Sequence, residues 1–446
     1  MERIGGEGAG ESSSIRQVAV ASFIGSAIEW YDFFLYGTAA ALVFNQLFFP
    51  SFEPLAGTLA SFATFGVAFV ARPIGGVIFG HYGDRVGRKT MLVITLLIMG
   101  LATFFIGLLP SFDSIGVLAP ILLVILRFLQ GLGVGGEWGG AALMAVEHSP
   151  PERRGYYGSW PQLGVPAGLL LSTGVFAMVS WLPDEQLLAW GWRLPFLFSI
   201  VLVGVGLYIR LKILETPAFS QVKEAHTEAR RPIVDVFRAY PRAVFLAAGA
   251  RFADNVLYYV FATFVLTYTT TQLGLPRSAA LIGVLIAAAL ELVTMPAFGA
   301  LSDRIGRRPV LMGGAIVMIL IAFPFFWLVD TGSSPLIWLA IVLALTVSHA
   351  AVFGPIAAFF SELFGTRVRY SGTSVGFQLG ALIAGAPTPF IATALLAWSG
   401  GEPWPISLLV LVAALVNLAS VYLAAETFRT DLTAERAEER RYVVTE

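Results

Sequence analysis

The sequence predicts an all-α polytopic membrane protein with about twelve transmembrane helices in two pseudo-symmetric six-helix bundles. Its composition, its recurring apolar runs and one repeated charged motif support this prediction. Hydrophobic residues make up 57% of the 446 residues, and charged residues only 13%. Because soluble domains are usually about 25% charged, this chain has too few charged residues to cover a water-exposed surface.

Apolar runs of about 20 residues recur along the whole chain, and each is long enough to cross about 30 Å of hydrocarbon. The first four cover residues 18–49, 59–81, 91–109 and 115–146, two more follow Tyr156, and six follow Pro241. The runs lack the period-2 alternation of a membrane β-barrel. Since only helices and closed barrels satisfy backbone polar groups in a bilayer, the runs are predicted to be helices.

Lys and Arg gather in alternate loops, which the positive-inside rule assigns to the cytoplasm. These loops contain residues 85–89, 153–154, 212–242, 304–308 and 367–369. The loops between them have Arg277 as their main basic exception and otherwise carry acidic residues, namely Glu53, Asp113, Asp184, Glu185, Asp330 and Glu402. We therefore expect a multi-pass protein of the inner (plasma) membrane with both termini in the cytoplasm.

The longest polar interruption, residues 212–242, divides the chain near its middle and is predicted to be a cytoplasmic linker. Six-helix bundles are expected over residues 15–211 (the first half) and 243–426 (the second half). Residues 1–14 are expected to be a disordered cytoplasmic N-terminus, and residues 427–446 a cytoplasmic tail. The chain has no cysteine, which excludes disulfides and thiolate metal sites. We also predict no cofactor, no metal, no nucleic-acid partner, and a monomer in the lipid bilayer.

A charged motif occurs once in each half. Residues 83–89 read Gly-Asp-Arg-Val-Gly-Arg-Lys, and residues 302–308 read Ser-Asp-Arg-Ile-Gly-Arg-Arg. Weaker echoes at similar offsets pair Glu147 with Glu362 and Gln162 with Gln378. The repeat indicates a duplicated chain, and parallel halves related by an axis along the membrane normal are a transporter architecture.

The loop at residues 83–89 resembles the signature between helices 2 and 3 of the major facilitator superfamily. Segments 29–33, 72–76, 80–85, 127–131, 135–140 and 191–196 are similar to the metabolite:proton symporter family. The resemblance is nearest to the shikimate permease branch, with alpha-ketoglutarate, citrate and proline/betaine permeases as relatives. The second half resembles the branch more loosely, since Glu291 stands where an uncharged residue is expected. The resemblance implies alternating access and a central cavity lined by helices 1, 4, 7 and 10.

Several charged side chains are predicted near mid-membrane, where each costs roughly 2.5 to 3.5 kcal/mol and is therefore a candidate for function. Counting residues from the loops gives the charged or titratable side chains predicted at this depth, namely Glu29, Asp32, Arg127, Arg251, Asp254, Glu291 and His349. Arg72 is predicted somewhat nearer the cytoplasm. Helical spacing places Glu29, Asp32 and Tyr36 on one face of a helix. It likewise places Arg127, Gln130 and Glu137 on one face of another.

The predicted proton-coupling residues are Asp32, Glu29, Arg127 and His349. A carboxylate whose proton affinity changes as an arginine moves beside it can act as a proton switch. We expect Asp32 to take a proton from the outward-open cavity, which frees Arg127 to hold a substrate carboxylate until inward opening releases both. The predicted substrate-binding residues are Arg72, Arg127, Gln130, Tyr36, Arg251, Asp254, Tyr258, Gln378 and Glu291.

Structural alternatives stay open for many of these residues. A purely structural role is the alternative for two sets of charges, namely Glu29, Asp32 and Arg127 as a helix-packing ion pair, and Arg251, Asp254 and Glu291 as local contacts. His349 fits a proton role because the ordinary pKa of histidine is near neutrality. It fits equally well as a hydrogen-bond donor to the substrate.

The repeated motif is predicted to form a conformational latch at the cytoplasmic face. Its residues would bridge helix ends in the outward-open state and separate on inward opening. They are Gly83, Asp84, Arg85, Gly87, Arg88 and Glu147 in the first half, and Asp303, Arg304, Arg307 and Glu362 in the second. The positive-inside rule alone would explain the arginines but not the paired aspartates. A phosphate loop is excluded because Tyr82 occupies the required glycine position.

The expected function is a proton-coupled symporter that imports a small organic acid or related polar metabolite, since buried arginines supply positive charge. One alternative is a proton-coupled importer of a zwitterionic compatible solute such as proline or betaine, held by aromatic rings. Another is a metabolite receptor on the same fold that does not transport. The sequence has no nucleotide loop, Cys/His cluster or nucleophile elbow, so we do not expect an enzyme.

Overall fold

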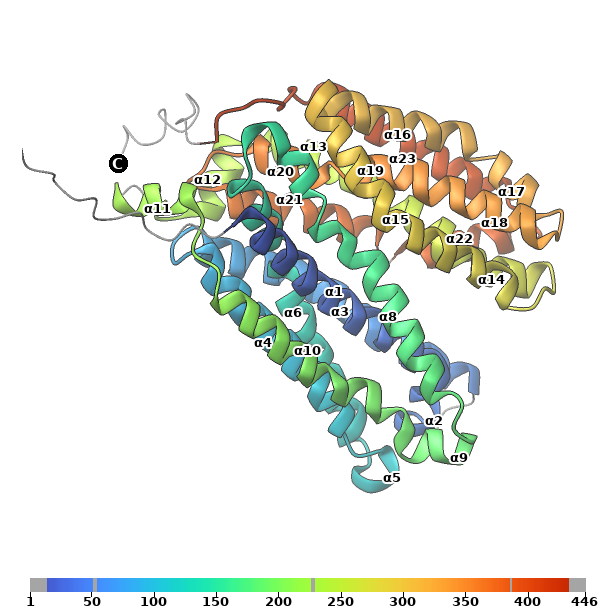
Figure 1. Cartoon of the computed structure of the whole chain (residues 1–446). Coiled ribbons are helices and arrows are strands. Elements are labelled where there is room, and N and C mark those ends of the chain that lie inside the picture. The colour runs from blue at the N-terminus through green and yellow to red at the C-terminus, as the bar shows by residue number, and fades with distance from the viewer. Residues whose placement is uncertain (1–13, 51–53, 226–228, 386, 433–446) are drawn as a thin grey trace, which may run out of the picture.

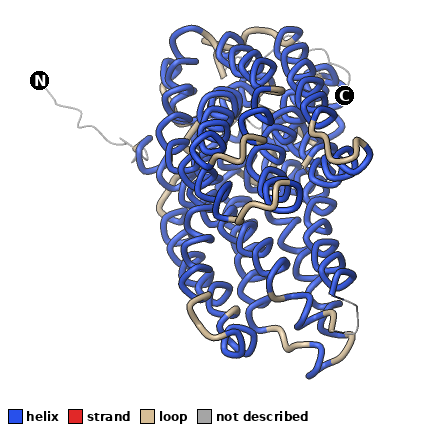
Figure 2. The backbone as a smooth tube through the Cα atoms, turned by 90° about the vertical axis from the view of Figure 1, so that its right-hand side faces the viewer, coloured by secondary structure: helices blue, strands red, loops and turns tan. Residues whose placement is uncertain are grey.

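The computed structural model describes residues 14–50, 54–225, 229–385 and 387–432. This part of the chain is built of helices and loops and contains no strand (Figure 2). Apart from Ser14, the predicted disordered N-terminus lies outside the described residues, and so do residues 433–446 of the predicted tail.

The first half forms a continuous series of helices. They are α1 (Ile15–Leu42), α2 (Phe44–Phe48), α3 (Pro54–Gly83), α4 (Arg88–Leu108), α5 (Phe112–Ile115), α6 (Leu118–Glu147), η1 (Pro151–Arg153), α7 (Arg154–Gly158), η2 (Pro161–Leu163), α8 (Gly164–Val179), α9 (Asp184–Gln186), η3 (Leu187–Gly191) and α10 (Arg193–Leu211). The apolar run predicted over residues 18–49 is divided at Val43. There the chain turns, and Phe44 of α2 packs edge-on against Trp192 with ring centres 5.7 Å apart.

The predicted linker contains two short helices, α11 (Pro217–Glu224) and α12 (Pro232–Ala239). The second half then repeats the helical series. It comprises α13 (Pro241–Tyr258), η4 (Tyr259–Phe264), α14 (Val265–Thr267), η5 (Tyr268–Gln272), α15 (Ser278–Ile305), α16 (Arg307–Ile321), α17 (Pro324–Val329), α18 (Ser334–Leu343), η6 (Ala344–His349), α19 (Ala350–Phe353), α20 (Ile356–Leu363), α21 (Arg369–Ala384), α22 (Pro387–Trp398) and α23 (Trp404–Leu423).

Nine helices in the described part of the chain are long and apolar enough to cross a membrane. Helix α3, the run from α13 to η5 and the run from α16 to α17 bring the number of long helical segments to about twelve, as expected of two bundles. The predicted all-helical membrane fold is therefore confirmed.

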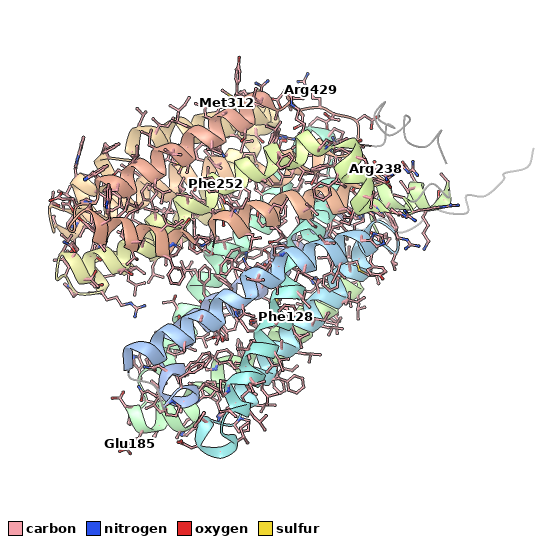
Figure 3. All side chains as sticks on the ribbon, turned by 180° about the vertical axis from the view of Figure 1, so that it is seen from behind. Phe128, Glu185, Arg238, Phe252, Met312 and Arg429 are labelled. Atoms are coloured by element: carbon pink, nitrogen blue, oxygen red, sulfur yellow. The ribbon has the colours of Figure 1, made fainter. Side chains whose placement is uncertain are left out.

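The two halves meet at one end and diverge towards the other (Figure 1). Helices α11, α12 and α20 lie at the end where the halves meet, which we call the closed end. Helices α2, α5, α9, α14 and α17 lie at the opposite, splayed end. Figure 3 shows Arg238 at the closed end and Glu185 at the splayed end. The basic and acidic loops of the sequence are thus found at opposite ends of the molecule.

Small residues let the halves approach closely at the closed end. A side chain at Gly83 would overlap the ring of Tyr370, and one at Gly155 would overlap the backbone carbonyl of Gly299. Each pair joins a helix of the first half to a helix of the second. The closed end is therefore sealed by direct backbone and ring contacts.

Candidate functional site

Four of the predicted site residues are charged side chains buried in the interior of the first half. Glu29 and Asp32 come from α1, Arg72 from α3 and Arg127 from α6, and each is at most 5% exposed. Buried charges are costly unless other groups in the protein or a ligand compensate them. The neighbours of each charge therefore indicate what it does.

A relay of neutral side chains connects Asp32 to Arg127. The hydroxyl of Thr103 on α4 donates to Oδ2 of Asp32 at 2.7 Å and accepts from Nε2 of Gln130 at 2.7 Å. Arg127 in turn donates to Oε1 of Gln130. The expected communication between Asp32 and Arg127 thus includes Thr103, which the sequence analysis did not single out.

Arg72 has aromatic neighbours around its guanidinium. The guanidinium carbon lies 4.7 Å from the ring centre of Phe33, 4.6 Å from that of Phe69 and 5.8 Å from that of Trp30. In the described part of the chain Arg72 takes part in no ion pair, and its buried Nε has no hydrogen-bond partner. Cation–π contacts hold a guanidinium in place without using its hydrogen-bond donors. The charge of Glu29 acts on Arg72, but no carboxylate oxygen of the described residues is within ion-pair distance, so the guanidinium donors are available to an anionic group.

Tyr36 belongs to the same buried region, whereas Glu137 has a different environment. The guanidinium carbon of Arg127 lies 4.1 Å from the ring centre of Tyr36. Glu137, further along the same face of α6, is ion-paired with Arg210 of α10 and accepts from the hydroxyl of Thr95 at 2.8 Å. Glu137 therefore ties α6 to α4 and α10.

The buried charges of the second half touch one another. Arg251 and Asp254, both on α13, form an ion pair. His349, at the end of η6, has Nε2 3.3 Å from Oδ1 of Asp254 and Nδ1 2.5 Å from Oε1 of Glu291 on α15. All four residues are at most 4% exposed. We call them the His349 cluster (Arg251, Asp254, Glu291 and His349).

The remaining predicted substrate-binding residues, Tyr258 and Gln378, lie on two different helices. The ring centre of Tyr258 is 5.1 Å from that of His349, so Tyr258 borders the cluster. Gln378 on α21 donates through Nε2 to the carbonyl of Gly135 on α6 at 3.1 Å, a contact between the halves. In this conformation Gln378 therefore helps to join the halves.

An aromatic stack also crosses between the halves. Trp138 of α6 stacks on Phe377 of α21 with ring centres 3.5 Å apart. The guanidinium carbon of Arg251 lies 4.0 Å from the ring centre of Phe377. The His349 cluster is therefore in contact with a side chain that packs directly on the first half.

Three arginines from both halves surround Tyr259 at the start of η4. The charges of Arg72, Arg251 and Arg127 all act on its buried hydroxyl group. The ring of Tyr259 lies 6.3 Å from that of Phe69 in the first half. The charges of arginines predicted from separate helices thus act on one buried side chain. Tyr259 itself was missed, because a tyrosine in an apolar run is ordinary membrane packing.

The first-half latch residues join helix ends at the closed end. Arg88 lies 3.4 Å from Oδ1 of Asp84 and 3.7 Å from Oε2 of Glu147. The two carboxylate oxygens of Asp84 accept from the backbone amides of Tyr370 and Ser371, at 3.1 and 2.8 Å. These amides belong to the first turn of α21, so Asp84 caps a helix of the opposite half.

The second half repeats this arrangement with closer contacts. Arg307 lies 2.6 Å from Oδ1 of Asp303 and 3.0 Å from Oε1 of Glu362. The oxygens of Asp303 accept from the backbone amides of Gly155 and Tyr156, at 2.7 and 2.8 Å. These amides lie in the first turn of α7, so each half of the molecule caps a helix of the other.

An ion pair between the halves stabilises the closed end, whereas the burial of ionised Asp84 is unfavourable there. Arg369 of α21 lies 2.8 Å from Oε1 of Glu147 of the first half, an ion pair between the halves. Burial raises the pKa of Asp84 to about 6, although the charge of Arg88 and the amides of Ser371 and Tyr370 lower it. Ionised Asp84 is therefore less favourable here than it would be in water.

Two predicted latch residues lie outside this network, and two glycines have a conformational role. Arg85 and Arg304 are exposed, and neither takes part in an ion pair among the described residues. Gly87 and Gly306 adopt φ values of 131° and 104°, which side chains with a Cβ rarely reach. The two glycines allow the sharp turn that directs the following arginine inward.

The sequence analysis missed two glutamates that complete the latch. Glu215 accepts from the backbone amide of Lys89 at 3.1 Å, and Glu426 accepts from those of Arg307 and Arg308 at 3.0 and 3.1 Å. Each glutamate caps the start of the helix that follows the repeated motif. The signal that identifies them is a Glu-Thr pair repeated at residues 215–216 and 426–427.

Two halves with duplicated charged loops at one end and convergent buried charges between them have the architecture of a secondary transporter. The sequence profile of the Major Facilitator Superfamily matches residues 22–389, and the chain belongs to this family. The protein is accordingly a multi-pass membrane transport protein and not an enzyme.

Relatives along nearly the whole chain are metabolite transporters. The chain is 44% identical over 428 residues to the shikimate transporter of Escherichia coli (strain K12), covering 95% of this chain and 97% of that protein. It is 37% identical over 416 residues to the proline/betaine transporter of the same organism, covering 90% and 82%. The structure of the proton:xylose symporter XylE shares the fold, with a TM-score of 0.74, 18% identity and coverage of 97% and 99%. The predicted resemblance to the superfamily, with the shikimate transporter among the relatives, is confirmed.

Proposed function

We propose that the protein imports a small organic anion, a monocarboxylate in the simplest case, together with a proton by alternating access. The basic loops at the closed end favour a cytoplasmic position for that end. The conformation described here is then outward-facing. Both chain termini would lie in the cytoplasm.

The observation that carries this proposal is the buried guanidinium of Arg72, which rests on aromatic rings and has no ion pair among the described residues. Arg127 is bonded to a neutral glutamine and Arg251 is paired with Asp254, whereas Arg72 rests on aromatic rings. A buried cation without an anionic partner is costly, and the carboxylate of a substrate would supply that partner. The site therefore favours an anion over a neutral metabolite.

A zwitterionic solute is the competing substrate class, since proline/betaine transporters are among the relatives. Such a solute would need free aromatic faces for its ammonium group. The guanidinium of Arg72 already lies over Phe33 and Phe69 and within 5.8 Å of the ring centre of Trp30. These rings are therefore engaged by the protein itself, which favours the organic anion.

Transport by purified protein in proteoliposomes tests the proposal. A pH-sensitive dye inside the vesicles reports proton entry while shikimate, benzoate-like acids, alpha-ketoglutarate, citrate, proline and betaine are added one at a time. One proton moving with a monoanion carries no net charge, so an imposed pH gradient should drive uptake and a membrane potential should not. Proton entry with a zwitterion, accelerated by an inside-negative potential, would overturn the anion assignment. Binding without any flux would favour a receptor.

The variant Arg72→Gln tests the anion site itself. Removing one partner of a buried charge pair costs about 2–5 kcal/mol, so substrate affinity should fall roughly thirtyfold or more. Arg277→Gln removes an exposed arginine at the splayed end and should leave affinity within about twofold. Equal losses in both variants would show that general electrostatic attraction, and not Arg72, binds the substrate.

A further inference from the structure

His349 is held in a position that suits proton binding. Its two ring nitrogens face two different carboxylates, Asp254 on α13 and Glu291 on α15. The other groups against the imidazole are the ring of Tyr258 and the ring of Phe353, with centres 5.1 Å away in both cases. Nδ1 is within hydrogen-bond distance of Glu291, whereas Oδ1 of Asp254 faces Nε2 at 3.3 Å and is a buried oxygen without a hydrogen-bond partner. The geometry therefore fits an imidazole or carboxyl group that carries an additional proton.

Formal charges in the His349 cluster point the same way. Arg251 contributes one positive charge, and Asp254 and Glu291 contribute one negative charge each. With a neutral imidazole the cluster therefore carries a net negative charge, and one added proton makes it neutral. Since all four side chains are buried, the neutral, singly protonated cluster is the favourable one in this conformation.

The cluster is also connected to the proposed anion site. Arg251 is one of the three arginines around Tyr259, and in this conformation it is paired with Asp254. A substrate carboxylate at Arg251 would compete with Asp254 for the guanidinium. Asp254 would then depend more on a protonated His349, so substrate binding and proton binding would favour each other.

We propose that Asp254, His349 and Glu291 form the proton-binding site of the transporter and that Arg251 couples it to the substrate. The coupled proton enters this site from the splayed end and leaves when the closed end opens. No bond other than those to the proton is made or broken. This inference rests on the proposed symport and assigns its proton to the second half, whereas the sequence analysis assigned it mainly to Asp32.

The variant Glu291→Gln gives the sharpest test, because it makes the cluster neutral without an added proton. If substrate binding requires one bound proton, the substrate Kd of the wild type should depend on pH. Above the pH at which the cluster loses its proton, this Kd should rise about tenfold for each pH unit. In Glu291→Gln the Kd should stay constant over that range. With a gradient of about one pH unit, wild-type vesicles should accumulate a monoanion about tenfold. Counterflow exchange of labelled for unlabelled substrate measures transport that needs no gradient. Relative to the rate of this exchange, accumulation driven by the pH gradient should fall about tenfold in Glu291→Gln and in His349→Gln.

Matched controls separate this assignment from the proposed function. Glu185→Gln and His148→Gln change the same residue types outside the cluster and should retain the wild-type ratio. If the cluster variants keep substrate-driven proton entry while Asp32→Asn loses it, the proton site is wrong and symport stands. If the wild type moves no proton with any substrate, the proposed symport itself fails.

A second measurement does not depend on the transport activity of the variants. Infrared difference spectra of the wild type in lipid, recorded between high and low pH with and without substrate, detect carboxyl and imidazole protonation. Isotope-labelled histidine identifies the imidazole bands. Substrate-dependent protonation bands that are absent from Glu291→Gln support the cluster. Unchanged bands in a folded Glu291→Gln protein would overturn the assignment.

Discussion

In the first half a hydroxyl and an amide separate Asp32 from Arg127, whereas in the second half Asp254 contacts both an arginine and a histidine. The two halves therefore both contain buried charges but arrange them differently. In the first half no carboxylate among the described residues is within ion-pair distance of Arg72, although the charge of Glu29 acts on it, and this arrangement suits an external anion. In the second half the His349 cluster has two carboxylates and one permanent cation, which suits a proton. The difference assigns the two ligands of a symporter to opposite halves.

The closed end shows the reverse, because there the halves have stayed alike. Asp84 and Asp303 each cap the first turn of a helix in the opposite half. A structure that must open and close symmetrically requires equivalent contacts on both sides. The contacts are nevertheless shorter around Arg307 than around Arg88.

The largest expected effect tests this difference in the latch. Arg307→Leu removes hydrogen bonds to Glu362, Asp303 and Ser302 and leaves buried carboxylates without their cation. Breaking such a buried pair costs about 3–5 kcal/mol. Arg88→Leu should cost less, about 2–3 kcal/mol, because the ion pairs of Arg88 are longer and Glu147 retains Arg369, although a hydrogen bond to the carbonyl of Thr366 is also lost. Thermal unfolding in detergent compares the two variants, and equal losses would contradict the difference between the halves.

The next effect concerns the close approach of the halves. A methyl group at Gly83 would overlap the ring of Tyr370, so Gly83→Ala should destabilise the closed end by about 1–3 kcal/mol. Because the native chain has no cysteine, spin labels at cysteines introduced in place of Arg85 and Arg367 can report the distance across this end. The distance distribution should shift to longer values. Gly174→Ala, with no atom within 4 Å of the added carbon, serves as the control and should not shift it.

A smaller effect follows from the carboxyl group of Asp84. Its pKa is about 6 when buried at the closed end and should return to about 4 when the end opens to water. The closed conformation therefore binds the extra proton more tightly than the open one. This proton stabilises the closed conformation at low pH, and the stabilisation is lost as pH rises through about 6. Between pH 7 and pH 5 the ratio of closed to open conformers should increase about tenfold, measured with the same spin labels. Asp84→Asn has no titrating group here, and an equally steep pH dependence in it would exclude Asp84 as the cause.

The sequence predicts that the charges of the His349 cluster are buried, but not how they contact one another. Counting residues from a loop fixes depth in a helix, so Asp254, Glu291 and His349 were placed in the interior on separate helices. Their contact depends on how α13, α15 and η6 rotate and pack, and no residue spacing records this. For the same reason residue spacing does not reveal Thr103 between Asp32 and Arg127, because a threonine hydroxyl is common in membrane helices.

Residues at helix ends were predictable only where a motif repeated. The aspartates and arginines of the latch stood out because polar residues in a seven-residue motif recur in both halves. Glu215 and Glu426 lie in polar segments where glutamate is unremarkable, although the threonine after each was a usable signal. Their role follows from the exposed backbone amides at the start of α4 and α16, which any nearby carboxylate can cap.

The smallest expected effect bears most directly on the comparison between the halves. If Asp32 serves the anion site and not the proton, Asp32→Asn should change the number of protons moved per substrate by less than about a tenth, within the error of most flux assays. Substrate affinity should instead rise, because removing a carboxylate makes the region around Arg127 and Arg72 more positive. The measurement is the initial proton and substrate flux in the same vesicles, with Glu291→Gln beside it. A loss of proton movement in Asp32→Asn but not in Glu291→Gln would place the proton in the first half and reverse the division of labour proposed here.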